Sequence, residues 1–246
     1  IQRRKEAGEE NNVHYVVHYS EIDGVFNLGG DLGRFAQLIR AQDRDRLTQY
    51  AKACIDVLHT NHINLGHNIN TIALLDGTAA GGGFEAALSN DIIIAERGVE
   101  MGFPEAIFNL FPGMGAYSFL TRRISPAKAE QIIKSGNMYS AEYMYELGIV
   151  DVLAEPGEAR TELQRYLKKH RKQANMHQAM EQVKECVNPI PYQELMDITT
   201  IWVDAAMRLP EANIRTMERL VKAQTHRMAK QKVQPQEEYF LHQASA

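Results

Sequence analysis

The stretch from residue 76 to residue 115 constrains the fold of this chain more than any other. Three consecutive glycines, Gly81, Gly82 and Gly83, stand directly before a helix-like run. The first N–H groups of a helix have no partner inside the helix, and glycine lets other groups approach them closely. The sequence therefore predicts a backbone corner that can hold a negatively charged oxygen. A phosphate is the alternative occupant, but the glycine and lysine patterns of phosphate-binding loops are missing.

Two glutamates accompany this corner. Glu85 lies roughly one helical turn beyond Gly82, and Glu105 follows a strand and a turn, directly after Pro104. Two carboxylates beside an oxyanion corner are suited to acid–base chemistry next to a carbonyl group. Each glutamate alone could be an ordinary surface carboxylate, and Glu85 could simply complement a helix dipole. Taken together, they are the candidate catalytic residues.

Several motifs in order along the chain resemble the crotonase, or enoyl-CoA hydratase/isomerase, superfamily. They are residues 26–32 (FNLGGDL), 80–85 (AGGGFE), 104–105 (PE) and 112–115 (PGMG). The two glutamates also stand at the spacing of that family's catalytic pair, and the resemblance covers residues 13–153. Ordered motifs at matching spacing are more specific than any one of them alone.

This resemblance implies a fold, a site and an assembly. The fold is α/β, a crotonase-like spiral of ββα units followed by a C-terminal helical subdomain. Glu85 and Glu105 are the implied catalytic residues, and the N–H groups of Gly30 and Gly82 form the implied oxyanion hole. The helical subdomain is expected to build a homotrimer. We expect neither a metal nor a cofactor.

A narrower resemblance is to the diffusible signal factor (DSF) synthases, bacterial makers of cis-2-unsaturated fatty-acid signals. It rests on the sequences FNLGGDL, GGGFEAAL, FPGMGAYSFL, IWVDAAM and RTMERLVKAQ. It implies dehydration of a 3-hydroxyacyl thioester on acyl carrier protein, followed by hydrolysis of the thioester. It also implies that Met114, Trp202 and Leu220 line the pocket for the acyl chain. A lone tryptophan such as Trp202 would otherwise be assigned to the core.

Other functions stay open at this stage. A plain enoyl-CoA hydratase or isomerase acting on CoA thioesters would use the same residues, and a non-catalytic crotonase-fold protein could bind a sensor or receptor protein. Both glutamates and both glycines are present, which favours an enzyme. A serine hydrolase is disfavoured because no G-x-S-x-G motif occurs. His59, His62 and His67 form a histidine cluster, but no cysteine or nearby carboxylate completes a metal site.

Composition narrows the class of protein further. Hydrophobic residues make up 44% of the 246 residues and charged residues 24%, which is ordinary for a globular enzyme. The net charge of −4 gives no basic footprint for nucleic acid. No apolar run reaches the length of about 18 residues that a membrane span needs. We expect a cytoplasmic protein.

The chain divides by character into four parts. Residues 1–12 are polar and are expected to be flexible or a truncated end, and residues 231–246 form a polar tail. Residues 13–155 are the predicted crotonase-like core, whose first strands in the family lie upstream of this chain and are apparently missing. An apolar stripe at helical spacing includes Leu47, Tyr50 and Cys54. Residues 156–230 are predicted to be helical, with helices over 158–187, 192–209 and 211–230.

Overall fold

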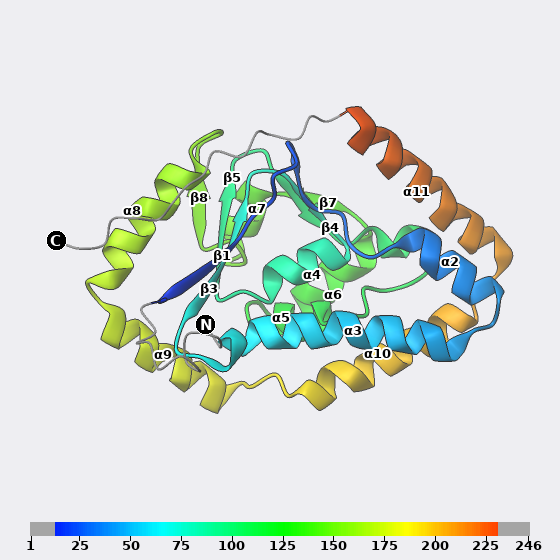
Figure 1. The fold of residues 1–246 in the computed structure, drawn as a ribbon, viewed down its shortest axis with the longest axis horizontal. Helices are drawn as coiled ribbons and strands as arrows, with labels where there is room; N and C mark the ends of the chain where they lie inside the picture. Colours follow the sequence, from blue (N-terminus) through cyan, green and yellow to red (C-terminus); the bar gives the residue numbers. More distant parts are fainter. Residues whose placement is uncertain (1–12, 231–246) are drawn as a thin grey trace, which may run out of the picture.

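The computed structural model describes residues 13–230, with side chains for residues 13–222. The expectations for residues 1–12 and 231–246 lie outside this part of the chain. The described residues form two four-stranded sheets with helices around them (Figure 1). The first sheet has the order β1 (Tyr15–His18), β3 (Asn70–Leu75), β5 (Ile92–Glu96) and β8 (Val152–Ala154). The second has the order β2 (Val25–Asn27), β4 (Thr78–Ala80), β6 (Glu100–Gly102) and β7 (Met138–Ser140).

Consecutive strands of the chain alternate between the two sheets. The first strand of each consecutive pair lies in the first sheet and the second strand lies in the second sheet. The pairs are β1 and β2, β3 and β4, and β5 and β6, and helical segments follow each pair. The strands of the first sheet are all parallel, while β7 closes the second sheet antiparallel to β6. This is the α/β spiral of ββα units that the sequence predicts, with C-terminal helices after it. The predicted fold class is confirmed.

The first sheet is covered on both faces, which explains its continuous apolar strands. One face carries Ile72, Leu74 and Ile94, which form a core cluster with helix α8 (Ala159–Arg171). The other face carries Ala73 and Leu75, which belong to the main core of the protein. Because both faces are buried, the strand Asn70–Leu75 is hydrophobic at its last four positions in succession.

Four helices of the core begin at residues whose side chains accept a hydrogen bond from a first-turn N–H group. Asp31, Asp43, Ser125 and Ser140 each accept a hydrogen bond from the N–H three residues later. The helical elements of this region are α2 (Leu32–Arg40), α3 (Arg44–His62), η1 (Asn64–Gly66), α4 (Gly82–Leu88), η2 (Pro104–Phe108), α5 (Ala116–Thr121), α6 (Pro126–Ser135) and α7 (Ala141–Glu146).

The C-terminal part consists of α8, α9 (Ala174–Val187), α10 (Tyr192–Met207) and α11 (Glu211–Lys230). The prediction of one helix over 158–187 was wrong, because the chain turns between α8 and α9. Helix α8 packs on the first sheet, whereas α9 has no buried residue. The ring of His177 in α9 stacks on that of His170 in α8, with their centroids 3.8 Å apart. None of the described helices is long and apolar enough to cross a membrane.

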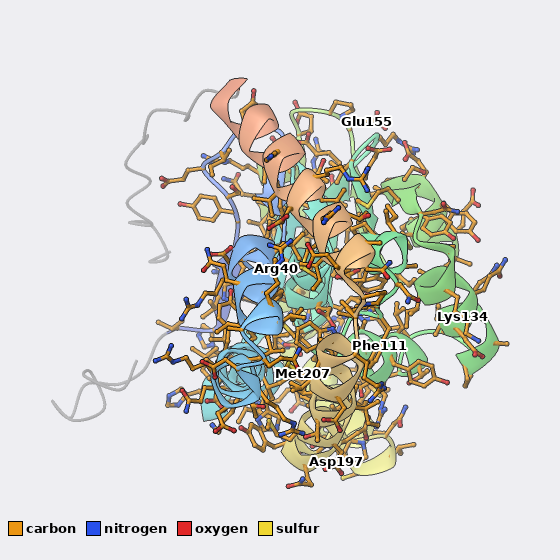
Figure 2. The ribbon with its side chains drawn as sticks, turned by 90° about the vertical axis from the view of Figure 1, so that its right-hand side faces the viewer. Arg40, Phe111, Lys134, Glu155, Asp197 and Met207 are labelled. Carbon is orange, nitrogen blue, oxygen red and sulfur yellow. The ribbon has the colours of Figure 1, made fainter. Side chains whose placement is uncertain are left out.

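Two helices of the C-terminal part lie against the N-terminal helices of the core. Helix α10 packs along α3, and α11 packs along α2 (Figures 1 and 2). Arg40 of α2 forms ion pairs with Glu211 and Glu218 of α11, and Arg44 of α3 pairs with Asp204 of α10. These pairs are exposed to solvent, which screens them, so they add little to the stability of the fold. Their main effect is to fix which helices are neighbours.

Helix α3 offers a matched test of this packing. Ile55 is fully buried and Val57, two positions away, is 68% exposed. Ile55→Ala should lower the free energy of unfolding by about 2–5 kcal/mol because it leaves a cavity. Val57→Ala should change it by no more than about 0.5 kcal/mol. Urea denaturation measures both, and equal effects would contradict the orientation of α3.

Candidate active site

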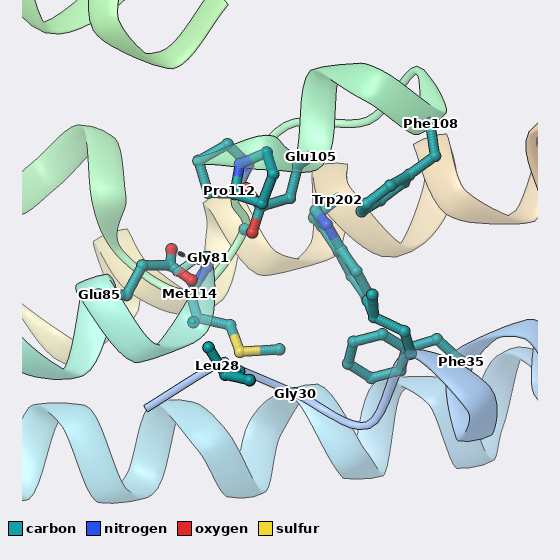
Figure 3. A pocket seen from close by; sticks show the side chains of 14 residues that line it. Leu28, Gly30, Phe35, Gly81, Glu85, Glu105, Phe108, Pro112, Met114 and Trp202 are labelled. Atoms are coloured by element: carbon teal, nitrogen blue, oxygen red, sulfur yellow. Dashed lines mark hydrogen bonds between the residues drawn. The ribbon is translucent and has the colours of Figure 1, made fainter. Parts of the chain in front are cut away.

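A small cavity opens between the loop from β2 to α2, the start of α4, η2 and α10. About 40 Å³ is accessible there to the centre of a water-sized sphere. Figure 3 shows the two carboxylates at one side, with Trp202 between Phe108 and Phe35 at the other. The cavity is lined by Leu28, Gly30, Leu32, Phe35, Gly81, Gly82, Glu85, Pro104, Glu105, Phe108, Pro112, Gly113, Met114 and Trp202. It therefore combines a polar end with an aromatic end.

Gly81 forms the corner between β4 and α4. Its backbone has φ 55° and ψ −127°, a conformation that residues with a side chain rarely adopt. Its N–H donates to the Gly102 carbonyl at 2.8 Å, which ties the corner to β6. A Cβ atom on Gly81 would lie 2.5 Å from Glu105 Oε1. Both the backbone conformation and the neighbouring carboxylate therefore require glycine at this position.

The predicted oxyanion glycines, Gly30 and Gly82, are brought together by backbone contact. A Cβ on Gly29 would lie 2.9 Å from the Gly82 nitrogen, and a Cβ on Gly83 would collide with the Asn27 carbonyl. A Cβ on Gly82 would lie 3.4 Å from the Gly30 nitrogen. Within residues 13–230, the N–H groups of Gly30 and Gly82 have no hydrogen-bond partner. Two free donors thus border one cavity.

Glu85 is held by the turn that follows β6 and η2. It is 1% exposed, and its Oε1 accepts hydrogen bonds from the N–H groups of Met114 at 2.7 Å and Ala116 at 3.0 Å. Burial raises the pKa of Glu85 to about 7, and the two N–H groups oppose this rise. Glu85 can therefore change its protonation state near neutral pH.

Glu105 lacks the hydrogen bonds that Glu85 has. Pro104 begins the short helix η2, and the Oε2 atom of Glu105 is buried without a partner among the described residues. Burial raises the pKa of Glu105 to about 8, and the negative charge of Glu85 adds to the rise. Because the carboxyls influence each other, they titrate as a pair. Near neutral pH this pair holds about one proton.

Two buried phenylalanines fix the positions of the glutamates relative to each other. Phe84 directly precedes Glu85, and Phe103 stands two residues before Glu105. Both rings are fully buried, and their centroids lie 5.0 Å apart. The α4 and η2 segments are therefore joined through the core directly behind the carboxylates.

Two of the three predicted acyl-pocket residues reach the cavity. Met114 and Trp202 line it, and a side chain on Gly113 would collide with the Trp202 ring. The hydroxyl of Thr199, in the same helix as Trp202, donates to the Gly113 carbonyl at 2.9 Å. Leu220 is not among the lining residues; it is half-buried and packs against the main core.

The sequence interpretation did not include Phe35 and Phe108, which form the aromatic end of the cavity with Trp202. The rings of Phe35 and Trp202 meet edge to face, with centroids 5.2 Å apart. Phe35 lies on the apolar face of α2, four residues after the Asp31 cap. Its helical spacing was therefore visible in the sequence, but its direction toward Trp202 was not.

The histidine cluster does not assemble into a metal site. The ring of His59 packs edge to face on Tyr192, and that of His62 on Phe119. Among residues 13–222, no three histidine, cysteine, aspartate or glutamate side chains gather in a way that could hold a metal ion. Burial lowers the pKa of His62 to about 4, so its ring is neutral at pH 7.

The fold and this site define a member of the enoyl-CoA hydratase/isomerase family, and the chain belongs to it: the family model matches residues 5–190. The chain is 27% identical over 146 residues to the mitochondrial methylglutaconyl-CoA hydratase of Rattus norvegicus. It is 26% identical over 159 residues to the peroxisomal fatty acid beta-oxidation multifunctional protein AIM1 of Arabidopsis thaliana. These matches cover 59% and 64% of this chain, but only 44% and 21% of those proteins.

Solved structures resemble the fold over more of its length. The human mitochondrial delta3-delta2-enoyl-CoA isomerase has a TM-score of 0.72 at 14% identity, covering 92% of this chain and 86% of that one. The enoyl-CoA hydratase of Bacillus halodurans has a TM-score of 0.71 at 20% identity, covering 89% and 86%. At these identities the likeness shows the shared fold.

The raised pKa values of the two glutamates predict how stability changes with pH. A carboxyl whose pKa is raised in the folded protein stabilises it most below its unfolded pKa of about 4.5, and this contribution is lost as the pH rises through 7 to 8. Glu105→Gln removes one such group. The melting temperature of this variant minus that of wild type should therefore increase from pH 5 to pH 9.

The exposed Glu146 at the end of α7 supplies the control. For Glu146→Gln, the difference in melting temperature from wild type should stay nearly constant over the same pH range. Scanning calorimetry measures both variants. A Glu105→Gln difference as flat as the control would show that Glu105 ionises without cost in the folded protein.

Proposed function

We propose that this chain is an enzyme that eliminates water from a 3-hydroxyacyl thioester. Glu85 and Glu105 are the proposed acid–base pair, and the N–H groups of Gly30 and Gly82 are the proposed oxyanion hole. The observation that carries this proposal is the cavity in which two carboxyls with raised pKa values face two unpartnered N–H groups. The family to which the chain belongs supports the same class of chemistry.

In the proposed reaction, the thioester oxygen accepts hydrogen bonds from Gly30 and Gly82. One glutamate, ionised, removes a proton from Cα and leaves an enolate whose charge the two donors stabilise. The other glutamate, protonated, donates its proton to the departing 3-hydroxyl, so the products are an enoyl thioester and water. The ionised glutamate gains a proton and the protonated one loses a proton, so the pair holds a single proton both before and after the reaction. This suits two carboxyls that share one proton near neutral pH. Each oxyanion donor contributes roughly 3 kcal/mol of transition-state stabilisation.

The aromatic end of the cavity supports an acyl chain as the rest of the substrate. Phe35, Phe108, Met114 and Trp202 present apolar surface there, and each buried methylene contributes about 0.8 kcal/mol to binding. The open space would hold only about three water molecules. A medium-length tail therefore requires these side chains to move apart on binding. Leu220, which lies outside the lining, could border the tail only after such a movement.

The finer proposal is a synthase of a cis-2-unsaturated fatty-acid signal of the DSF type. The same two N–H groups would stabilise the tetrahedral oxyanion formed when water attacks the thioester. The C–S bond then breaks, the carrier thiol takes up the proton lost by the water, and the free unsaturated acid leaves. The sequences around Gly30, Glu85 and Trp202 support this choice. Acyl carrier protein as the carrier, a homotrimeric assembly, a sensor or receptor protein as partner and a cytoplasmic location remain predictions that accompany it.

A plain enoyl-CoA hydratase or isomerase is the second candidate. It is favoured by the two similar structures, which are named as an enoyl-CoA hydratase and an enoyl-CoA isomerase. It would use the same four residues on a CoA thioester and would stop at the thioester product. The hydratase and the signal synthase therefore differ in one step, the hydrolysis of the thioester, while an isomerase would move a double bond and remove no water.

Product analysis decides between these candidates. The chain is incubated with 3-hydroxyacyl thioesters of several chain lengths, on acyl carrier protein and on CoA, and the products are identified by mass spectrometry. We expect a free 2-unsaturated acid from the medium-length carrier-protein substrates. Glu85→Gln and Glu105→Gln should each lose at least about 99% of the turnover, since each removes a proton-transfer group, and Glu146→Gln should keep it.

The other outcomes are equally clear. An enoyl thioester without free acid would establish the plain hydratase and refute the signal synthase. The absence of any product from any 3-hydroxyacyl substrate would refute both the synthase and the hydratase. Incubation with a 3-enoyl thioester then separates an isomerase, which moves the double bond, from a binding protein, which leaves the thioester unchanged. Full turnover in either glutamine variant would refute the acid–base role of that glutamate.

A further inference from the structure

The loop that carries Gly30 is held by side chains on both sides of the free N–H. The Gly29 N–H donates to the Asn27 side-chain oxygen at 2.8 Å. The Asp31 N–H donates to the Tyr50 hydroxyl at 3.1 Å. The Gly30 N–H between them has no partner among the described residues. Of three successive N–H groups, the outer two are fixed and the middle one is left to the cavity.

These two hydrogen bonds restrain a loop whose glycines would otherwise leave its backbone free to change conformation. Gly29 and Gly30 have no side chains, and Gly29 has a φ of +91°, so the loop has unusual backbone freedom. The direction of the Gly30 N–H depends on the peptide units on either side of it. Fixing the Gly29 N–H and the Asp31 N–H therefore restricts the Gly30 donor without occupying it.

Tyr50 is itself well anchored beside this loop. It belongs to α3, and its ring meets that of Phe35 edge to face with centroids 4.9 Å apart. Phe35 in turn contacts Trp202. A Cβ on Gly30 would lie 2.9 Å from the Phe35 ring and 3.8 Å from the Tyr50 hydroxyl. The hydroxyl thus lies next to Gly30, while its ring packs on a residue that lines the cavity.

We propose that Tyr50 is a positioning residue of the active site: its hydroxyl orders the 29–31 loop so that the Gly30 N–H is aimed at the substrate oxygen. This inference rests on the proposed function, in which that N–H stabilises an oxyanion. Tyr50 does not touch the reacting atoms. Its hydroxyl acts through the Asp31 peptide, and its ring contributes to packing separately.

Tyr50→Phe separates these two contributions, because it removes only the hydroxyl. Complete loss of an oxyanion donor lowers kcat by about 10²–10³, so a misdirected donor should lower it by about tenfold. KM should change by less than about twofold, because the lost interaction is made in the transition state. Hydrogen exchange should accelerate at residues 29–31, while the melting temperature and exchange in α3 stay close to wild type.

The matched control is Tyr192→Phe. The Tyr192 hydroxyl donates to Asp56, also on α3, at 2.6 Å, and Tyr192 lies outside the cavity lining. This variant should keep wild-type kcat and wild-type exchange at residues 29–31. The two variants therefore each remove one tyrosine hydroxyl. The Tyr50 hydroxyl, on α3, contacts the loop, whereas the Tyr192 hydroxyl bonds to a residue of α3 and does not contact the loop.

Three results would overturn the inference. Unchanged exchange at residues 29–31 in Tyr50→Phe would show that the hydroxyl does not order the loop. Accelerated exchange with wild-type kcat would show that the order has no catalytic effect. A wild-type protein without turnover on any thioester would refute the proposed function itself, and the role of Tyr50 with it, since Gly30 would have no oxyanion to bind.

Discussion

The close approach of two backbone segments, residues 27–30 and the corner at Gly81, Gly82 and Gly83, is the constraint on which the site depends. A side chain at Gly29 or Gly83 would strike the opposite backbone, and one at Gly81 would strike the Glu105 carboxylate. Their absence lets two loops meet with their N–H groups exposed between them. The spiral of ββα units makes this meeting possible, because β2 and β4, which lead into the two segments, are parallel neighbours in one sheet. The fold thus delivers two donors to one place.

The buried carboxyl pair is the part of this arrangement that lowers the stability of the folded protein. Glu105 has a buried oxygen without a partner, and the buried Glu85 is satisfied by only two N–H groups on one oxygen. Such groups lower the stability of a protein unless they stay protonated or are compensated elsewhere. The compensation here is the core behind them, where Phe84 and Phe103 pack together. Strained polar groups supported by a rigid core are typical of active sites.

The features that depend on local sequence could be predicted. The glycine corner, both glutamates, and the helix starts at Ser125 and Ser140 follow from residues close together in the chain. The features that depend on distant packing could not. The stripe including Tyr50 was interpreted as apolar, and nothing local shows that its hydroxyl meets Asp31. For the same reason, nothing local shows that Leu220 lies outside the cavity lining and packs, half-buried, against the main core.

The ends of the C-terminal helices also show the difference between local sequence and distant packing. The sequence gives no glycine or proline between residues 158 and 187, so one continuous helix was the natural expectation. The break arises because α8 follows the sheet and α9 leaves it, a choice made by tertiary contacts. By contrast, Trp202 was expected in the acyl-chain pocket only through family resemblance. The structure adds the physical reason, since only a glycine at position 113 leaves room for its ring.

The central claim is that Glu85 and Glu105 share about one proton near neutral pH. The most direct test is a titration of their side-chain carboxyl carbons by ¹³C NMR in wild type and in Glu85→Gln. The account predicts that two glutamates of wild type titrate with pKa values near 7 and 8. In Glu85→Gln the pKa of Glu105 should fall but stay above that of an ordinary glutamate, because the charge is gone and the burial remains. Titration of every glutamate below pH 6 in wild type would contradict the account.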